Sequence, residues 1–172
     1  MNELPKITKY EIGMAGELFV ASECFRRGIW VSITMGNHKT VDLMAQNPKS
    51  GDVKCLEVKS KSPKDGAWIF DITKNARKNL LYVLVDYRGY FRDHIERTVS
   101  NVNKNWRPKC YIIPSKEIRK YWKPSKYHKS GVVPLSKIRH LNKYHEKWSL
   151  IFDNGVKDGP LPKSKRKIKS KK

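Results

Sequence analysis

The stretch Val41-Asp42-Leu43-Met44-Ala45, followed closely by Lys54-Cys55-Leu56-Glu57-Val58-Lys59, decides the fold of this chain. Both segments are short and mostly apolar, as strands are. The connector between them, Asn47-Pro48-Lys49-Ser50-Gly51-Asp52, is rich in turn-forming residues. The pattern therefore predicts two neighbouring strands joined by a hairpin or a tight loop.

Three charged side chains are embedded in these two strands: Asp42, Glu57 and Lys59. Because side chains alternate across a strand, Glu57 and Lys59 should project from one face, opposite the apolar residues between and before them. Charges on an inner strand cost free energy unless they are paired or bind a metal. Two carboxylates and an ammonium beside a basic surface predict a site for a hard divalent cation and a phosphate.

The net charge of +21 on 172 residues indicates polyanionic partners, with nucleic acid first among them. Residues 157–172 carry +7 of this charge, so residues 1–156 remain strongly basic by themselves. The length fits one domain. We expect a folded domain over 1–156 and a disordered basic tail over 157–172. A solvated basic surface without chemistry is the alternative explanation of the charge.

Cysteine usage and hydropathy bear on where the protein works. Cys24, Cys55 and Cys110 are widely spaced and form no CxxC pair, which argues against a disulfide framework or a structural zinc site. No apolar run is long enough to cross a bilayer, and the N-terminus lacks a hydrophobic signal region. These features predict a protein of the reducing cytoplasm, associated with the nucleoid in a prokaryotic or viral setting, and no membrane partner.

The rest of the chain alternates helical and strand patterns. Apolar residues at helical spacing predict a first helix over 9–27, ended by Gly28. The whole pattern predicts an α/β fold, with a central mixed sheet of five or six strands flanked by helices. Further strands are expected over 29–33, 67–72, 80–86 and 110–114, helices over 116–122 and 135–148, and a basic loop over 123–134.

Several of these residues together resemble the PD-(D/E)XK nuclease superfamily, which has the restriction-endonuclease-like fold. The resemblance covers residues 10–60: Gly13-Met14-Ala15-Gly16-Glu17-Leu18-Phe19-Val20-Ala21, Arg27-Gly28, Asn37, Val41-Asp42-Leu43 and Glu57-Val58-Lys59-Ser60. One departure is that Val41 stands where the family often has proline. The chain is similar in size to small stand-alone members such as Holliday-junction-resolvase-like nucleases.

This resemblance implies a role for each residue of the motif. Asp42 and Glu57 would be Mg²⁺ ligands, with Mn²⁺ as a substitute and the backbone carbonyl of Val58 as a further ligand. Lys59 would hold the attacking water and offset charge on the phosphate. Glu17 would be an accessory catalytic acid that tunes the site or helps hold a second ion. The implied reaction is hydrolysis of DNA to a 5′-phosphate and a 3′-hydroxyl, by a homodimer if the enzyme resolves junctions.

Candidates for nucleic-acid contact lie outside the motif, in polar and basic segments. Each has a plainer alternative as a solvated loop residue, and phosphate contact is a commoner fate for arginine than base readout. They are Asn37, Lys39, Lys61, Lys74, Arg88 and Arg92.

Structural alternatives exist for the motif as well. Asp42 is also suited to capping a turn, Glu57 with Lys59 to an exposed charge cluster on an edge strand, and Glu17 to a surface ion pair. Three functions therefore compete: a Mg²⁺-dependent DNA endonuclease of the junction-resolving, repair or restriction-like kind, a non-catalytic nucleic-acid-binding protein with the same fold, and a protein-interaction factor with a basic docking face.

Overall fold

A five-stranded mixed sheet is the centre of the molecule, in the strand order β1-β2-β3-β5-β6. The computed structural model describes residues 8–34, 41–61, 66–72, 77–87, 107–127, 130–153 and 155–161. β3 pairs antiparallel with β2 and parallel with β5, which makes the sheet mixed and β3 an inner strand. The predicted α/β class and central sheet are confirmed. The strands are β1 (Trp30–Ile33), β2 (Leu43–Gln46), β3 (Val53–Lys61), β5 (Leu80–Asp86) and β6 (Lys109–Pro114).

The first helix, α1 (Lys9–Phe25), begins and ends at recognisable signals. Thr8 and Glu11 form a capping box: the Glu11 backbone N–H donates to the Thr8 hydroxyl at 3.2 Å, and the Thr8 N–H donates to the Glu11 carboxylate at 2.6 Å. After the helix, Gly28 adopts a φ of 71°, a left-handed conformation that glycine reaches without strain. The predicted helix over 9–27 is therefore confirmed, with an end two residues earlier.

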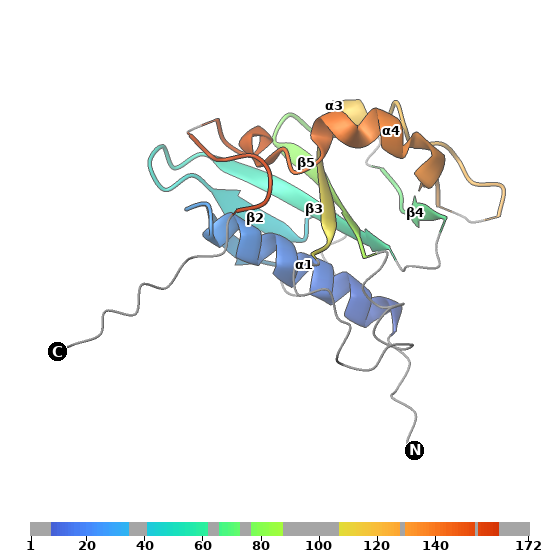
Figure 1. The fold of residues 1–172 in the computed structure, drawn as a ribbon, viewed down its shortest axis with the longest axis horizontal. Coiled ribbons are helices and arrows are strands. Elements are labelled where there is room, and N and C mark those ends of the chain that lie inside the picture. Colours follow the sequence, from blue (N-terminus) through green and yellow to red (C-terminus); the bar gives the residue numbers. More distant parts are fainter. Residues whose placement is uncertain are drawn as a thin grey trace, which may run out of the picture.

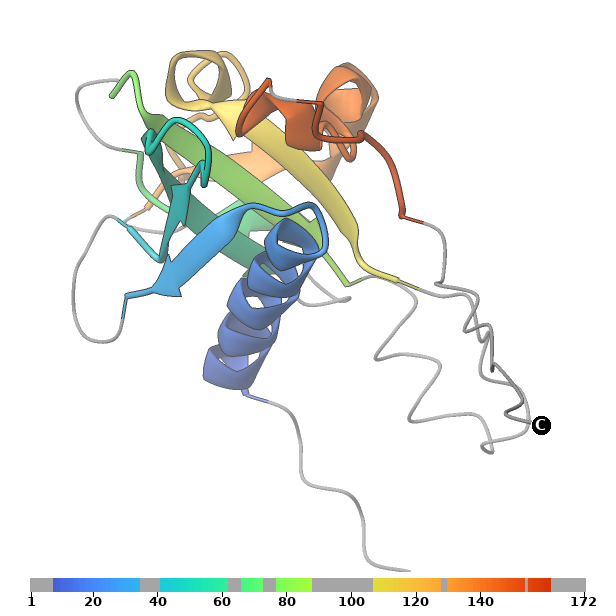
Figure 2. The same cartoon turned by 90° about the vertical axis from the view of Figure 1, so that its left-hand side faces the viewer.

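Figures 1 and 2 show α1 covering one face of the sheet, while α3 (Ser115–Ile118) and α4 (Ile138–Leu141) lie on the other. Strand β5 is buried on both faces because it separates two apolar cores. Leu81, Val83 and Val85 pack toward α1, whereas Leu80, Tyr82 and Leu84 pack toward the opposite layer. The continuous apolar run of β5 had predicted a strand covered on both faces, and this is confirmed.

The prediction of a strand over 67–72 in the central sheet is corrected by the structure. Only β4 (Ala67–Ile69) is a strand, and it pairs with β7 (Val132–Pro134) in a separate two-stranded sheet. Residues 123–134, predicted to be a loop, thus contain a strand. Strand propensity indicates extended backbone, but it does not choose the partner strand.

The two C-terminal helices are shorter than the sequence patterns indicated. The helix predicted over 116–122 is only α3, and the one predicted over 135–148 is divided into short pieces. These pieces are η2 (Leu135–Lys137), α4, η3 (Asn142–Tyr144) and, after a break, η4 (Trp148–Leu150). None of the helices in the described segments is long and apolar enough to span a bilayer.

The end of the described chain packs against the C-terminal end of α1. Arg27 donates hydrogen bonds to the carbonyls of Lys157, at 3.2 Å, and Gly159, and Arg26 donates to the carbonyl of Leu161 at 3.3 Å. These contacts involve the first residues of the predicted tail. Residues 162–172 lie outside the described residues, so the predicted domain boundary stays a prediction.

Candidate active site

The β2–β3 hairpin brings Asp42 against the middle of β3. The turn that makes this possible is closed by Asn47, whose side-chain oxygen accepts a hydrogen bond from the Lys49 N–H at 2.9 Å. Asp42 lies just before β2, and its N–H donates to the Leu56 carbonyl at 3.0 Å. Its carboxylate Oδ2 accepts a hydrogen bond from the Val58 N–H at 2.7 Å. The side chain is thus held by the neighbouring strand, and the described contacts do not make it a turn cap.

Glu57 and Lys59 lie on the same face of β3, as their spacing predicts, and they form an ion pair. The Lys59 ammonium is 3.1 Å from Glu57 Oε1 and 4.0 Å from Asp42 Oδ2. The Glu57 side chain is 6% exposed, whereas those of Asp42 and Lys59 are 23% and 27% exposed. The alternative of an exposed charge cluster on an edge strand is therefore wrong, because Glu57 is buried and β3 is an inner strand.

The carboxylate of Glu57 is only partly satisfied. Among the described residues, its Oε2 atom is buried and has no hydrogen-bond partner. Burial raises the pKa of Glu57, while the Lys59 ammonium and a hydrogen bond from Tyr82 act in the opposite direction. A buried oxygen without a partner is unfavourable for folding alone, and such atoms in a native structure call for an explanation such as an ion or a catalytic role.

Glu17 comes to this cluster from α1 because the helix approaches β3 closely at Gly16. A Cβ atom added to Gly16 would overlap the Ser60 hydroxyl and would lie 3.6 Å from a methyl group of Val58. Burial raises the pKa of Glu17, the Asp42 carboxylate raises it further, and the Lys59 ammonium lowers it. Glu17 is therefore within electrostatic reach of Asp42 and Lys59.

These residues fit a magnesium ion chemically. Mg²⁺ is usually bound through one or two carboxylates and keeps several waters, so Asp42 and the partnerless oxygen of Glu57 suit it. In the described residues, no group of three or more His, Cys, Asp or Glu side chains is placed so that it could hold a metal ion. The Val58 carbonyl and Glu17 as further ligands remain predictions.

Of the residues predicted to contact nucleic acid, the structure corrects one, and the others lie outside the described residues. Lys61 is 2% exposed, and its ammonium pairs with Asp86 at 3.3 Å. The two residues are register partners at the ends of the parallel strands β3 and β5. The prediction that Lys61 contacts nucleic acid is therefore wrong for this structure, because a buried, paired ammonium presents no charge to a phosphate. Asn37, Lys39, Lys74, Arg88 and Arg92 lie outside the described residues.

Tyr82 is a site residue that the sequence patterns missed. It is the register partner of Glu57 in β5, is fully buried, and lowers the pKa of Glu57. In the sequence it is the one polar-tipped side chain within the apolar run over 80–85. A buried tyrosine hydroxyl usually needs a hydrogen-bond partner. A tyrosine within this apolar run was therefore the available signal that a polar group lies beside it.

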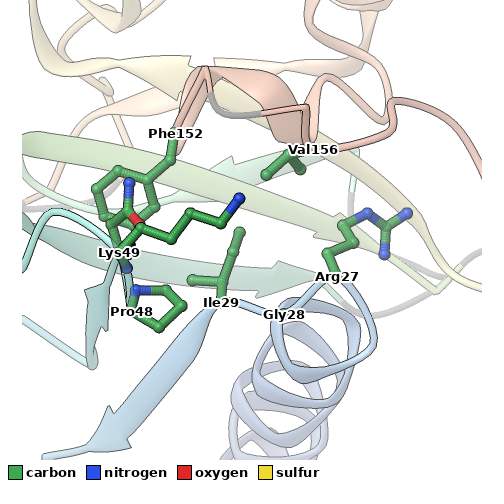
Figure 3. Close-up of a pocket in the computed structure, with 8 residues that line it drawn as sticks. Arg27, Gly28, Ile29, Pro48, Lys49, Phe152 and Val156 are labelled. Carbon is green, nitrogen blue, oxygen red and sulfur yellow. Dashed lines mark hydrogen bonds between the residues drawn. The ribbon is translucent and has the colours of Figure 1, made fainter.

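A surface hollow at the other end of α1 does not contain any of the predicted site residues. Figure 3 shows Arg27, Ile29, Lys49 and Phe152 around it. Its complete lining is Arg27, Gly28, Ile29, Asn47, Pro48, Lys49, Phe152 and Val156. The charge of Arg27 is already paired with Glu23 at 2.7 Å. The hollow therefore lacks the carboxylates that the chemistry of the motif requires.

Comparison with known proteins gives a limited result. No protein-family model matches the sequence. No curated protein matches it. Among solved structures, the chain is similar to that of a bacterial homing endonuclease, I-Ssp6803I, with a TM-score of 0.48 and 18% sequence identity. The match covers 87% of this chain and 95% of that chain.

Proposed function

We propose that this protein is a metal-dependent DNA endonuclease of the PD-(D/E)XK type. One observation carries the proposal: Asp42, Glu57 and Lys59 converge on an inner strand, and the buried Glu57 carboxylate keeps an oxygen without a partner. A purely structural ion pair would be expected to satisfy its buried oxygens. This oxygen is therefore the acceptor that we assign to a further positive ligand.

Each residue has a distinct task in this proposal. Asp42 and Glu57 would hold Mg²⁺, with Asp42 fixed in place by the Val58 N–H. The bound ion supplies a Lewis acid for phosphodiester hydrolysis. Lys59, which is partly exposed, orients the attacking water and offsets negative charge on the phosphate. Glu17, which lies on α1, adds a further negative charge to the site.

DNA as the substrate is supported by the charge of the protein. A net charge of +21 favours binding to a polyanion, and it makes that binding dependent on salt. The same charge also fits the second candidate function, a nucleic-acid-binding protein without catalytic activity. The two functions differ in turnover and in their dependence on Asp42.

A cleavage panel tests the proposal. Supercoiled plasmid, linear, nicked and single-stranded DNA, a fork and a four-way junction are each incubated with the protein in Mg²⁺, Mn²⁺ or EDTA. We expect Mg²⁺-dependent cleavage of at least one substrate, lost in EDTA and in Asp42→Ala. The preferred substrate then separates junction-resolving, repair and restriction-like activity.

The matched control is Asp52→Ala, which removes an exposed carboxylate from the same hairpin. It should cleave like the unmodified protein. Binding without cleavage of any substrate would favour the non-catalytic function. Cleavage that persists unchanged in Asp42→Ala would overturn the assignment of the site.

A further inference from the structure

A short projection lies between α3 and β7, and we call its described residues, 122–127 and 130–132, the lysine arm. Its two ends run side by side: the Lys123 N–H donates to the Val132 carbonyl at 2.9 Å, and the Val132 N–H donates to the Lys123 carbonyl at 2.7 Å. The chain therefore leaves the body and returns beside itself, as a hairpin does. In Figure 1 this segment lies at the right of the view, above β4.

The base of the lysine arm is fixed to the segment that follows β4. The Trp122 indole N–H donates to the Phe70 carbonyl at 2.8 Å, and the Phe70 N–H donates to the Gly131 carbonyl at 3.0 Å. Asp71 accepts a hydrogen bond from the Gly131 N–H at 3.3 Å. A Cβ atom at Gly131 would overlap the Trp122 ring, so the two sides of the arm are in direct contact. These contacts fix the base of the lysine arm, which carries the outer residues of the arm.

The lysine arm is on the same face of the central sheet as the candidate active site. The Phe70 ring stacks on Tyr82 with their centroids 5.5 Å apart. Tyr82 is the register partner of Glu57, so the two side chains lie on the same face of the sheet. One aromatic pair therefore connects the base of the arm to the strand neighbour of Glu57.

The outer part of the lysine arm has an unusual surface. Tyr127 is 91% exposed, the highest exposure of any large hydrophobic residue in the described part of the chain. Lys123 and Lys126 beside it are exposed, and no acidic side chain of the described segments pairs with either. An exposed aromatic ring among unpaired ammonium groups has no role in the core. It offers what single-stranded nucleic acid recognises: a stacking surface for a base and cations for its phosphates.

We propose that the lysine arm is a second DNA-contacting element, which binds an unpaired part of the substrate. Lys123 and Lys126 contact phosphates, and Tyr127 stacks on an exposed base. This inference rests on the proposed function for its ligand, DNA, and it adds a substrate class: DNA with single-stranded or distorted character near the cleavage site. An intact duplex presents no base face to Tyr127, so the ring contributes little to binding it.

The phosphate contacts are tested by the salt dependence of binding. The double variant Lys123→Gln/Lys126→Gln and the unmodified full chain are titrated with a fluorescent single-stranded oligonucleotide in EDTA, at several salt concentrations. Each lost phosphate contact lowers the slope of log K against log salt by about 0.7 for a single strand. We expect a decrease of about 1.4. The control double variant, Lys49→Gln/Lys109→Gln, removes two exposed lysines elsewhere and should keep the original slope.

The stacking contact is tested with Tyr127→Ala. We expect binding to single-stranded DNA to weaken by about fivefold or more, from the usual strength of base–aromatic stacking, and binding to intact duplex to change by less than about twofold. Tyr10→Ala is the control, because Tyr10 is another strongly exposed tyrosine at 74%. Thermal unfolding should be unchanged in both variants.

The results separate this inference from the proposed function. Binding is measured in EDTA, so it does not depend on the metal site or on cleavage. If the arm variants bind both DNA forms as their controls do, the inference is overturned even if the protein proves to be a nuclease. If the arm variants behave as expected but no DNA is cleaved, the inference about the arm is supported and the proposed function is overturned.

Discussion

α1 contributes a glutamate to each of two charged clusters, and the clusters differ in how their carboxylates are satisfied. The first, which we call the catalytic cluster after its proposed role, is Glu17, Asp42, Glu57 and Lys59. The arginine cluster, at the C-terminal end of the helix, is Glu23, Arg26, Arg27, Arg107 and Glu146. In the first, carboxylates outnumber the cation, and burial raises the pKa of Glu17 and of Glu57. In the second, cations outnumber carboxylates.

The contacts of Glu23 show what a completed site looks like. Its carboxylate accepts hydrogen bonds from all three arginines, including Arg27 at 2.7 Å and Arg107 at 3.1 Å. Burial alone would raise the pKa of Glu23, but the hydrogen bond from Arg27 and the charge of Arg107 outweigh it, so the pKa is lowered. Glu57 has one cation and keeps a partnerless oxygen. In the arginine cluster, the buried atom without a partner is a donor, Arg107 Nε, whereas in the catalytic cluster it is a carboxylate oxygen, which is the kind of atom that the proposed cation requires.

The largest expected effect comes from breaking the arginine cluster. Glu23→Ala leaves the Arg27 side chain, 1% exposed, without its carboxylate partner. We expect a loss of about 3–5 kcal/mol in the free energy of unfolding, because removing one partner leaves a buried charge uncompensated. Urea unfolding measures it. Ser22→Ala, at an exposed position of the same helix, should cost much less. Equal losses in the two variants would contradict a structural role for the cluster.

The close approach of α1 to β3, which brings Glu17 to the site, is tested by substituting two glycines of α1. Gly16→Ala forces a Cβ atom against the Ser60 hydroxyl, so we expect a loss of about 1–3 kcal/mol from overpacking. Gly13→Ala meets no atom within 4 Å and should stabilise the helix by about 0.5–1 kcal/mol. Chemical denaturation measures both. The same sign for both substitutions would show that α1 does not approach β3 as described.

The smallest expected effect is the pH dependence of Tm in two glutamine variants. Their Tm shifts at pH 7 should have opposite signs. The raised pKa of Glu57 means that its ionisation opposes folding above the ordinary glutamate pKa, and that this penalty is absent below it. Glu57→Gln should therefore raise Tm at pH 7, and the difference should disappear near pH 4. The lowered pKa of Glu23 means that its ionised form stabilises the fold at pH 7, and this stability is lost as the pH falls. Glu23→Gln should lower Tm at pH 7, with a gap that narrows in acid.

Thermal melts between pH 4 and pH 7 decide this prediction. Two variants that shift Tm in the same direction at pH 7 would mean that the clusters do not differ in the way described.

Local patterns in the sequence predicted that three charged residues come together, while their catalytic role stays a prediction. Asp42 lies just before β2, Glu57 and Lys59 lie in β3, and strand alternation alone put the last two on one face. The same reasoning failed for Lys61, because its burial depends on Asp86 in another strand. It also missed the arginine cluster, whose Glu23–Arg107 and Arg107–Glu146 contacts join residues far apart in the chain. Partners that come together only in the folded chain leave no periodic signal in the sequence.

The same limit explains the errors in the fold. Gly28 marked the end of α1 correctly, because a glycine stop is a local feature. Strand β4 was recognised as extended, but its pairing with β7 depends on a segment more than sixty residues away. The short helical pieces after Leu135 followed no clear period, and a single helix was the wrong prediction there.

Calorimetric titration of the full chain with Mg²⁺ tests most directly whether the catalytic cluster is arranged for a cation. The account predicts a binding isotherm for the unmodified protein that is lost in Asp42→Ala and in Glu57→Gln, and kept in Asp52→Ala. An isotherm that is the same in all four proteins, or no binding heat in the unmodified one, would contradict it.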